Sequence, residues 1–204
     1  MSLFRNHVPQ RTGESGQFNT YSEYKDTLKI DFYECCGYCN DSHNYMGGWR
    51  GMQIDHFAPR TPFVELEHEY DNLVYSCFYC NNAKSNDWVS DSPDRPISDD
   101  GTRGYVNPRE EAYTELFSRN SNGSIRPMSN LGLYIYTNLN LGLLRHELIN
   151  TMEKIFSLTE KIDLLIEKGD LNNEVETVLI NNRGLLLHKR FKLEKQFREI
   201  INAR

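Results

Sequence analysis

Four cysteines occur as two pairs, in each of which two residues separate the thiols. The pairs are Cys36/Cys39 and Cys77/Cys80. A two-residue gap lets a tight turn aim both thiolates at one metal ion, and two such pairs complete a tetrahedral Zn²⁺ site. With Cys35 the chain has five cysteines, and an odd, clustered set argues against a disulfide framework. We therefore predict a structural zinc site made by the two pairs.

Cys35 is left over by this assignment, and two interpretations stay open for it. It is either a buried thiol or a competitor of Cys36 for the same ligand position, although pairing with Cys39 would then need a three-residue gap. A redox role for Cys36 and Cys39 is a further alternative. It is disfavoured because nothing around them resembles a β–α–β unit.

Residues between and just after the cysteine pairs suit phosphodiester hydrolysis: Asp55, His56, Asn72, Asn81 and Lys84. A phosphodiester anion repels hydroxide, so its cleavage requires a cation at the phosphate and a base that deprotonates water. Asp55 and Asn81 offer oxygen ligands suited to Mg²⁺ or Mn²⁺. An imidazole with a pKa of about 6.5 is mostly neutral at pH 7, so His56 is the candidate base.

The other candidates have supporting or competing interpretations. Successive strand residues point to opposite faces, so the chain must bend after Asp55 and His56 for both to reach one site. Asn72 is expected to fasten the loop between Pro59 and Asp71 through side-chain hydrogen bonds to the backbone, which would hold His56 in register. Asn81 is either a metal ligand or a helix cap. Lys84 is either a phosphate contact or a solvated charge.

The coarse pattern predicts elements that would position these residues. We expect a helix over 21–33, strands over 52–57 and 72–77, a short helix over 78–88, a linker over 90–104, and small strands within 105–136 around the Asn122-Gly123 turn and at Tyr134–Tyr136. His43 and His68 are interpreted as exposed loop histidines.

Apolar residues recur at helical spacing in the last third of the chain. Leu143 to Ile166 and Val175 to Ile200 are predicted as two helices that form an antiparallel hairpin, with Gly184 as a potential interruption of the second. The apolar side of the second helix is predicted to be buried, at Val175, Val178, Leu179, Leu186, Leu187, Phe191, Leu193, Phe197 and Ile200. Binding of another protein to part of this face is the alternative.

Composition limits the classes of function. The chain of 204 residues has a net charge of −6, which excludes a generally basic nucleic-acid surface. Residues 183–204 carry 7 basic and 2 acidic residues, and either a solvated helix face or a nucleic-acid contact explains them. Residues 1–17 lack the apolar core of a signal peptide, and no apolar run is long enough to span a membrane. We expect a cytoplasmic protein.

The segment Cys36 to Lys84 resembles the HNH endonucleases, which have a ββα-metal fold with a four-cysteine zinc ribbon. The resemblance implies that His56 is the general base, that Asn72 is structural, and that Asn81 binds the catalytic metal together with Asp55. Many members carry histidine at the position of Asn81. An amide oxygen suits Mg²⁺, whereas an imidazole admits softer metals. Asparagine at position 81 therefore changes which metal ion the site is expected to prefer.

Downstream motifs resemble the HNH proteins of Septu-type and retron-associated antiphage systems. They are Asn107-Pro108, Gly123-Ser124-Ile125, and Leu139-Asn140-Leu141 with Arg145. Those nucleases typically work with an ATPase, so the resemblance implies an ATPase or other protein partner, here expected on the C-terminal helices. A homo-oligomer is also compatible with the sequence.

The sequence thus predicts an α+β protein with four parts: a flexible N-terminus (1–20), an HNH core with a zinc ribbon (21–90), a connector with short strands (91–142) and a helical hairpin (143–204). Its expected activity is hydrolysis of DNA phosphodiester bonds with Zn²⁺ as structural metal and Mg²⁺ or Mn²⁺ as catalytic metal. A zinc-ribbon adaptor that binds nucleic acid or protein without cutting is the main alternative. A metalloenzyme that acts on a small molecule is less compatible with the sequence, because no sequence pattern indicates an apolar ligand pocket.

Overall fold

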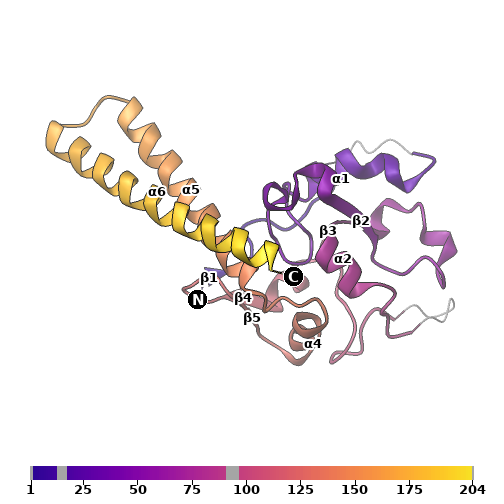
Figure 1. The fold of residues 1–204 in the computed structure, drawn as a ribbon. Coiled ribbons are helices and arrows are strands. Elements are labelled where there is room, and N and C mark those ends of the chain that lie inside the picture. The colour runs from indigo at the N-terminus through magenta and orange to yellow at the C-terminus, as the bar shows by residue number, and fades with distance from the viewer. Residues whose placement is uncertain (1, 13–17, 91–96, 204) are drawn as a thin grey trace. The chain divides into compact units, whose positions relative to one another are not determined.

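The computed structural model describes residues 2–12, 18–90 and 97–203, which form a mixed α+β structure (Figure 1). The chain divides into two compact units, Met1–Leu143 and Leu144–Arg204. The strands are β1 (Ser2–Leu3), β2 (Met52–His56), β3 (Leu73–Cys77), β4 (Phe117–Arg119) and β5 (Ile125–Pro127). The helices are α1 (Lys25–Asp31), α2 (Phe78–Lys84), α3 (Glu111–Glu115), α4 (Asn130–Asn138), α5 (Leu144–Glu167) and α6 (Asn173–Asn202).

A two-stranded sheet and the helix that follows it form the centre of the first unit. β2 pairs antiparallel with β3 in a register that sets Met52 opposite Cys77 and His56 opposite Leu73. α2 begins directly after β3, so the order is strand, strand, helix, as predicted. The helix is shorter than expected because Ser85 has a positive φ of 49°, which is incompatible with a right-handed helix and ends it.

The segment before the first cysteine pair packs on β3. A 3₁₀ turn at Tyr21–Tyr24 leads into α1, where a single helix was predicted. Glu23 accepts a hydrogen bond from the backbone N–H of Thr20 at 3.0 Å, which satisfies a donor at the start of the turn. Leu28 from α1 is fully buried in the same core cluster as β3.

A second sheet, in the order β1-β4-β5, supports the cysteine region. β4 and β5 are joined at the predicted Asn122-Gly123 turn, where Gly123 has φ 94°. Arg119 is almost fully buried, and its guanidinium donates to the carbonyls of Phe4, Gly123 and Cys39. It therefore ties β1, the turn and the first cysteine pair together. β1 lies in the segment 1–20 that was predicted to be flexible, of which residues 1 and 13–17 are outside the described residues.

The prediction of a strand at Tyr134–Tyr136 was wrong, because these residues belong to α4. Ser129 precedes the helix and its Oγ accepts from the backbone N–H of Gly132 at 3.0 Å, which caps it. The alternating aromatic and aliphatic residues imitate a strand over too short a stretch to decide the period.

The second unit is the predicted helical hairpin of α5 and α6 (Figure 1). The Asn172 side chain caps α6 by accepting from the N–H of Val175 at 2.9 Å, and Arg183 pairs with Asp163 at 2.6 Å. α6 continues through Gly184 without a break. No described helix is long and apolar enough to cross a membrane.

The prediction of a buried apolar side on α6 was wrong for most of its residues. Several are exposed: Val175, Val178, Leu187 and Phe191, the last at 67%. Within the described part of α6, Phe197 alone is buried. Two helices have too little facing surface to cover an apolar stripe that extends around each of them.

Candidate active site

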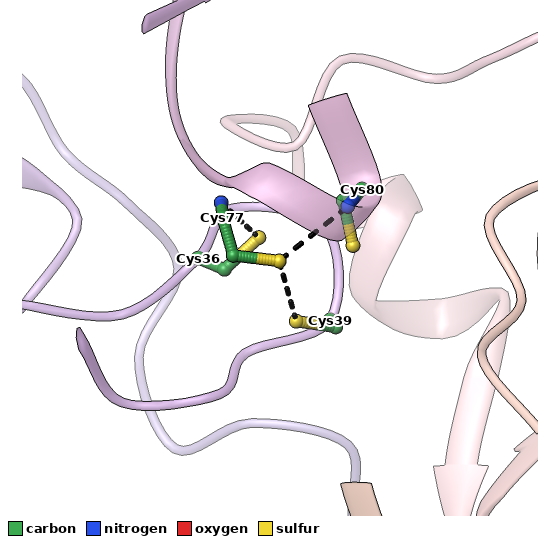
Figure 2. Close-up of side chains that lie close together, drawn as sticks. All are labelled: Cys36, Cys39, Cys77 and Cys80. Atoms are coloured by element: carbon green, nitrogen blue, oxygen red, sulfur yellow. Dashed lines mark hydrogen bonds between the residues drawn. The ribbon is translucent and has the colours of Figure 1, made fainter. Parts of the chain in front are cut away.

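Two short chain segments bring four cysteine side chains to one point in the interior (Figure 2). Cys36 and Cys39 lie on a turn, Cys77 ends β3, and Cys80 lies in the first turn of α2. Their Sγ atoms all lie within 4.8 Å of one another, and those of Cys39 and Cys77 are 3.9 Å apart. Tetrahedral Zn–S bonds of about 2.3 Å place sulfurs about 3.8 Å apart. The four buried cysteines are therefore spaced as a zinc site requires.

The surroundings of the sulfurs also suit a metal. Backbone N–H groups point at two of them, from Cys77 to the sulfur of Cys36 at 3.3 Å and from Cys80 to that of Cys77 at 3.5 Å. Burial raises the pKa of the Cys39 thiol well above its usual value. Thiolates in such an interior need a cation to stabilise them, and the chemistry of this donor set is that of a structural zinc site.

Two residues near the cluster lie outside it. Cys35 is half-buried and does not belong to the group of four. The prediction that His43 is exposed was wrong: the side chain is buried, with Nδ1 3.1 Å from the hydroxyl of Tyr75 and Nε2 3.5 Å from Glu34. A 3₁₀ turn at His43–Met46 folds it against β3. His68 is exposed, as predicted.

Asp55 is a buried carboxylate near the end of β2. Its Oδ2 accepts hydrogen bonds from the hydroxyl of Tyr38 at 2.5 Å and from Nζ of Lys84 at 3.2 Å. Burial raises the pKa of Asp55, and the charge of Lys84 opposes this effect. Both contacts use the same oxygen, so they fix the orientation of the carboxylate.

His56 is the last residue of β2, and its ring is held by the loop that follows. Nε2 lies 2.9 Å from the carbonyl oxygen of Glu67. A carbonyl only accepts, so Nε2 carries the hydrogen and the lone pair of the neutral ring is on Nδ1. The ring of Tyr21 packs edge-on against the imidazole. Burial lowers the pKa of His56, which keeps the imidazole unprotonated near neutral pH.

Asn72 fastens the loop that contains Glu67. Its Oδ1 accepts from the N–H of Ala58 at 2.7 Å, and its Nδ2 donates to the carbonyls of Ala58 and Leu66, both at 3.1 Å. Leu66 directly precedes Glu67, whose carbonyl holds the His56 ring. Asn72 therefore has the backbone contacts that the sequence predicts for it.

Asn81 lies on α2 and faces β2. Its Nδ2 donates to Oε1 of Gln53 at 2.6 Å, which leaves its Oδ1 as an acceptor. A polar cavity of about 250 Å³ is lined by Asn81 together with Asp55 and His56. Three side chains that sequence analysis expects at one site therefore share one cavity in the structure.

Residues 36–87 match the model of the HNH endonuclease family. The matched segment begins at the first cysteine of the cluster and includes β2, β3 and α2. It supports a nuclease function in general. Neither a curated protein nor a solved structure matches the chain.

Lys84 of the HNH segment does not fit the expected phosphate contact. Its side chain is fully buried, and Nζ donates to the backbone oxygen of His56 at 3.0 Å besides contacting Asp55. Its ammonium also lies over the ring of Tyr105 at 5.7 Å. A group enclosed in this way holds the end of β2 in place instead of meeting a ligand.

Sequence analysis missed several residues around the cavity that Asp55, His56 and Asn81 line. Tyr38, Tyr21 and Gln53 contact the three expected side chains, and Arg60 lines the cavity. Tyr38 lies inside the first C-x2-C pair, a position that could have drawn attention to it. The other contacts depend on how distant segments pack, and no local pattern indicates them.

Proposed function

We propose that this chain is a metal-dependent DNA endonuclease in which His56 is the general base. The observation that carries the proposal is the shared cavity of an imidazole, a carboxylate and an amide oxygen, in a segment that matches the HNH family. Asp55 and Asn81 would hold Mg²⁺ or Mn²⁺, because both offer oxygen donors. Hydrolysis would leave a 5′ phosphate and a 3′ hydroxyl.

The protein's own groups would divide the work as follows. Nδ1 of His56 accepts the proton of the attacking water, while the Glu67 carbonyl keeps the ring in the required tautomer. Tyr38 and Lys84 fix the Asp55 carboxylate. A divalent cation bound there supplies charge neutralisation at the phosphate and at the leaving oxygen.

The test is plasmid nicking by His56→Ala with Mg²⁺ or Mn²⁺, with and without EDTA. Loss of the base should lower the rate by about 10²–10⁴-fold while the folded state persists. His68→Ala is the matched control, because His68 is an exposed histidine near the same tyrosine, with its ring 6.2 Å from that of Tyr21. Cleavage by His56→Ala at the wild-type rate would contradict the assignment.

The same assay separates the nuclease from the adaptor. An adaptor would bind nucleic acid or protein with the zinc site intact, yet it would not cleave DNA in the presence of Mg²⁺ or of Mn²⁺. Its cavity would have no use for the imidazole tautomer that the Glu67 carbonyl fixes.

We further propose that the protein acts in the cytoplasm in antiphage defence, with an ATPase bound to the hairpin of α5 and α6. The support is the resemblance of the downstream motifs and the exposed apolar side chains of α6, among them Leu185 at 70% and Phe191 at 67%. An ATPase activity is expected to copurify with the wild-type protein. The combined substitution Leu185→Glu and Phe191→Glu should abolish this copurification. Copurification at the wild-type level would argue against the hairpin as the docking surface.

A further inference from the structure

We propose that Arg60 forms a phosphate-binding subsite of the His56 cavity and that the Glu67 carboxylate occupies this subsite when DNA is absent. This inference rests on the proposed nuclease function, since it takes the ligand to be a DNA phosphodiester. Lys84 is buried against Asp55 and does not line the cavity, so the lysine does not provide the phosphate contact considered for it.

Arg60 is the residue that supplies a positive charge to the cavity. Among the described residues lining the cavity, it is the one that carries a permanent positive charge. Its side chain is 53% exposed, so a ligand as large as a DNA strand reaches it without a rearrangement of the core. A guanidinium offers a planar set of N–H donors that matches two oxygens of a phosphate, which an ammonium does not.

The resting position of Arg60 is defined by two contacts. NH1 lies 3.3 Å from Oε1 of Glu67, and the guanidinium carbon lies 5.6 Å from the centre of the Tyr21 ring. The Tyr21 ring packs edge-on against His56, with 4.7 Å between the ring centres. Arg60 is therefore held beside the candidate base by residues that themselves contact the base.

Glu67 makes two contacts through different groups. Its backbone oxygen holds Nε2 of His56, while its side-chain carboxylate holds Arg60. An ion pair between partly exposed side chains is weak in water, so a phosphodiester can replace the carboxylate at little cost. Replacement leaves the backbone contact in place, and the orientation of the base is therefore preserved when the substrate binds.

The test is DNA binding by the full chain in a His56→Ala background, measured by fluorescence anisotropy with a short labelled duplex over a range of salt concentrations. Arg60→Gln should weaken binding roughly tenfold and lower the slope of log K against log[salt] by about 0.9, the value for one lost phosphate contact. Glu67→Gln should strengthen binding by up to about fivefold, because it removes the competing carboxylate.

Arg50→Gln is the matched control, because Arg50 is an exposed arginine of the same unit that does not line the cavity. It should leave affinity and salt slope unchanged. Equal effects of Arg60→Gln and Arg50→Gln would assign the loss to general charge and overturn the subsite. So would an unchanged affinity of Arg60→Gln, or a weaker affinity of Glu67→Gln.

Nicking by the proteins that retain His56 separates this inference from the proposed function. If the wild type cleaves DNA and Arg60→Gln has an unchanged KM, the nuclease stands and the subsite is wrong. If the wild type does not cleave, the nuclease proposal fails, and the binding data still decide whether Arg60 contacts phosphate.

Discussion

The strand–strand–helix segment and the C-terminal hairpin use their apolar residues in opposite ways. All five residues of β3 are buried, whereas α6, with thirty residues, buries Phe197 alone. The structure of the first region is therefore determined by close packing on every side. The structure of the second is determined by helix formation and by packing of α5 and α6 along one side. A substitution should therefore destabilise the protein most where neighbouring side chains surround the substituted residue.

The largest effect is expected for Cys80→Ser. Loss of one of four buried thiolates should release the zinc and unfold the core, because the binding free energy of a structural zinc site, roughly 10 kcal/mol or more, is also folding free energy. Zinc content per chain and the thermal transition measure the result. Cys35→Ser, outside the cluster, should retain both. A zinc-free, folded and active Cys80→Ser protein would refute the ribbon assignment.

An intermediate effect is expected for Gly37→Ala in the turn between Cys36 and Cys39. A methyl group there would lie 2.6 Å from Cε1 of Phe32 and 2.8 Å from Cγ1 of Val74, both of them buried. Overpacking of this kind costs about 1–3 kcal/mol. Urea denaturation measures the change in unfolding free energy. Unchanged stability would mean that the turn is less tightly enclosed than the structure shows.

The smallest effect, and of opposite sign, is expected for Gly184→Ala in α6. A methyl group there meets no heavy atom within 4 Å apart from its chain neighbours and the backbone of its own helix, and alanine restricts the unfolded chain more than glycine does. The helix should gain about 0.5–1 kcal/mol. The melting temperature followed by circular dichroism measures it. A loss of stability would show that position 184 is covered in solution, and would weaken the contrast between the two regions.

The sequence predicts best what neighbouring residues decide. Each C-x2-C pair is local, so the cluster follows once β3 leads into α2, and its four members are confirmed as a group. The hairpin is likewise confirmed, since helical spacing and a short connection specify it. The exposed apolar side of α6 could not be read from spacing, because an apolar stripe does not reveal what covers it.

The environment of the candidate site was less accessible to sequence analysis. Lys84 is buried because Tyr105 and the end of β2 enclose it, and these segments are far apart along the chain. His43 is buried for the same kind of reason, through Tyr75 of β3. Long-range packing therefore decides whether a polar side chain meets solvent, and residue type alone does not reveal it.

The contact between His56 and a main-chain oxygen has a consequence for how the protein tolerates change. No substitution at position 67 that preserves the path of the chain removes that oxygen, so the proton stays on Nε2 whatever side chain occurs there. Asn72, through its bond to Leu66, maintains the path. The side chain at position 67 is thus open to adjust how strongly Arg60 is restrained, while the backbone oxygen of the same residue continues to hold the imidazole.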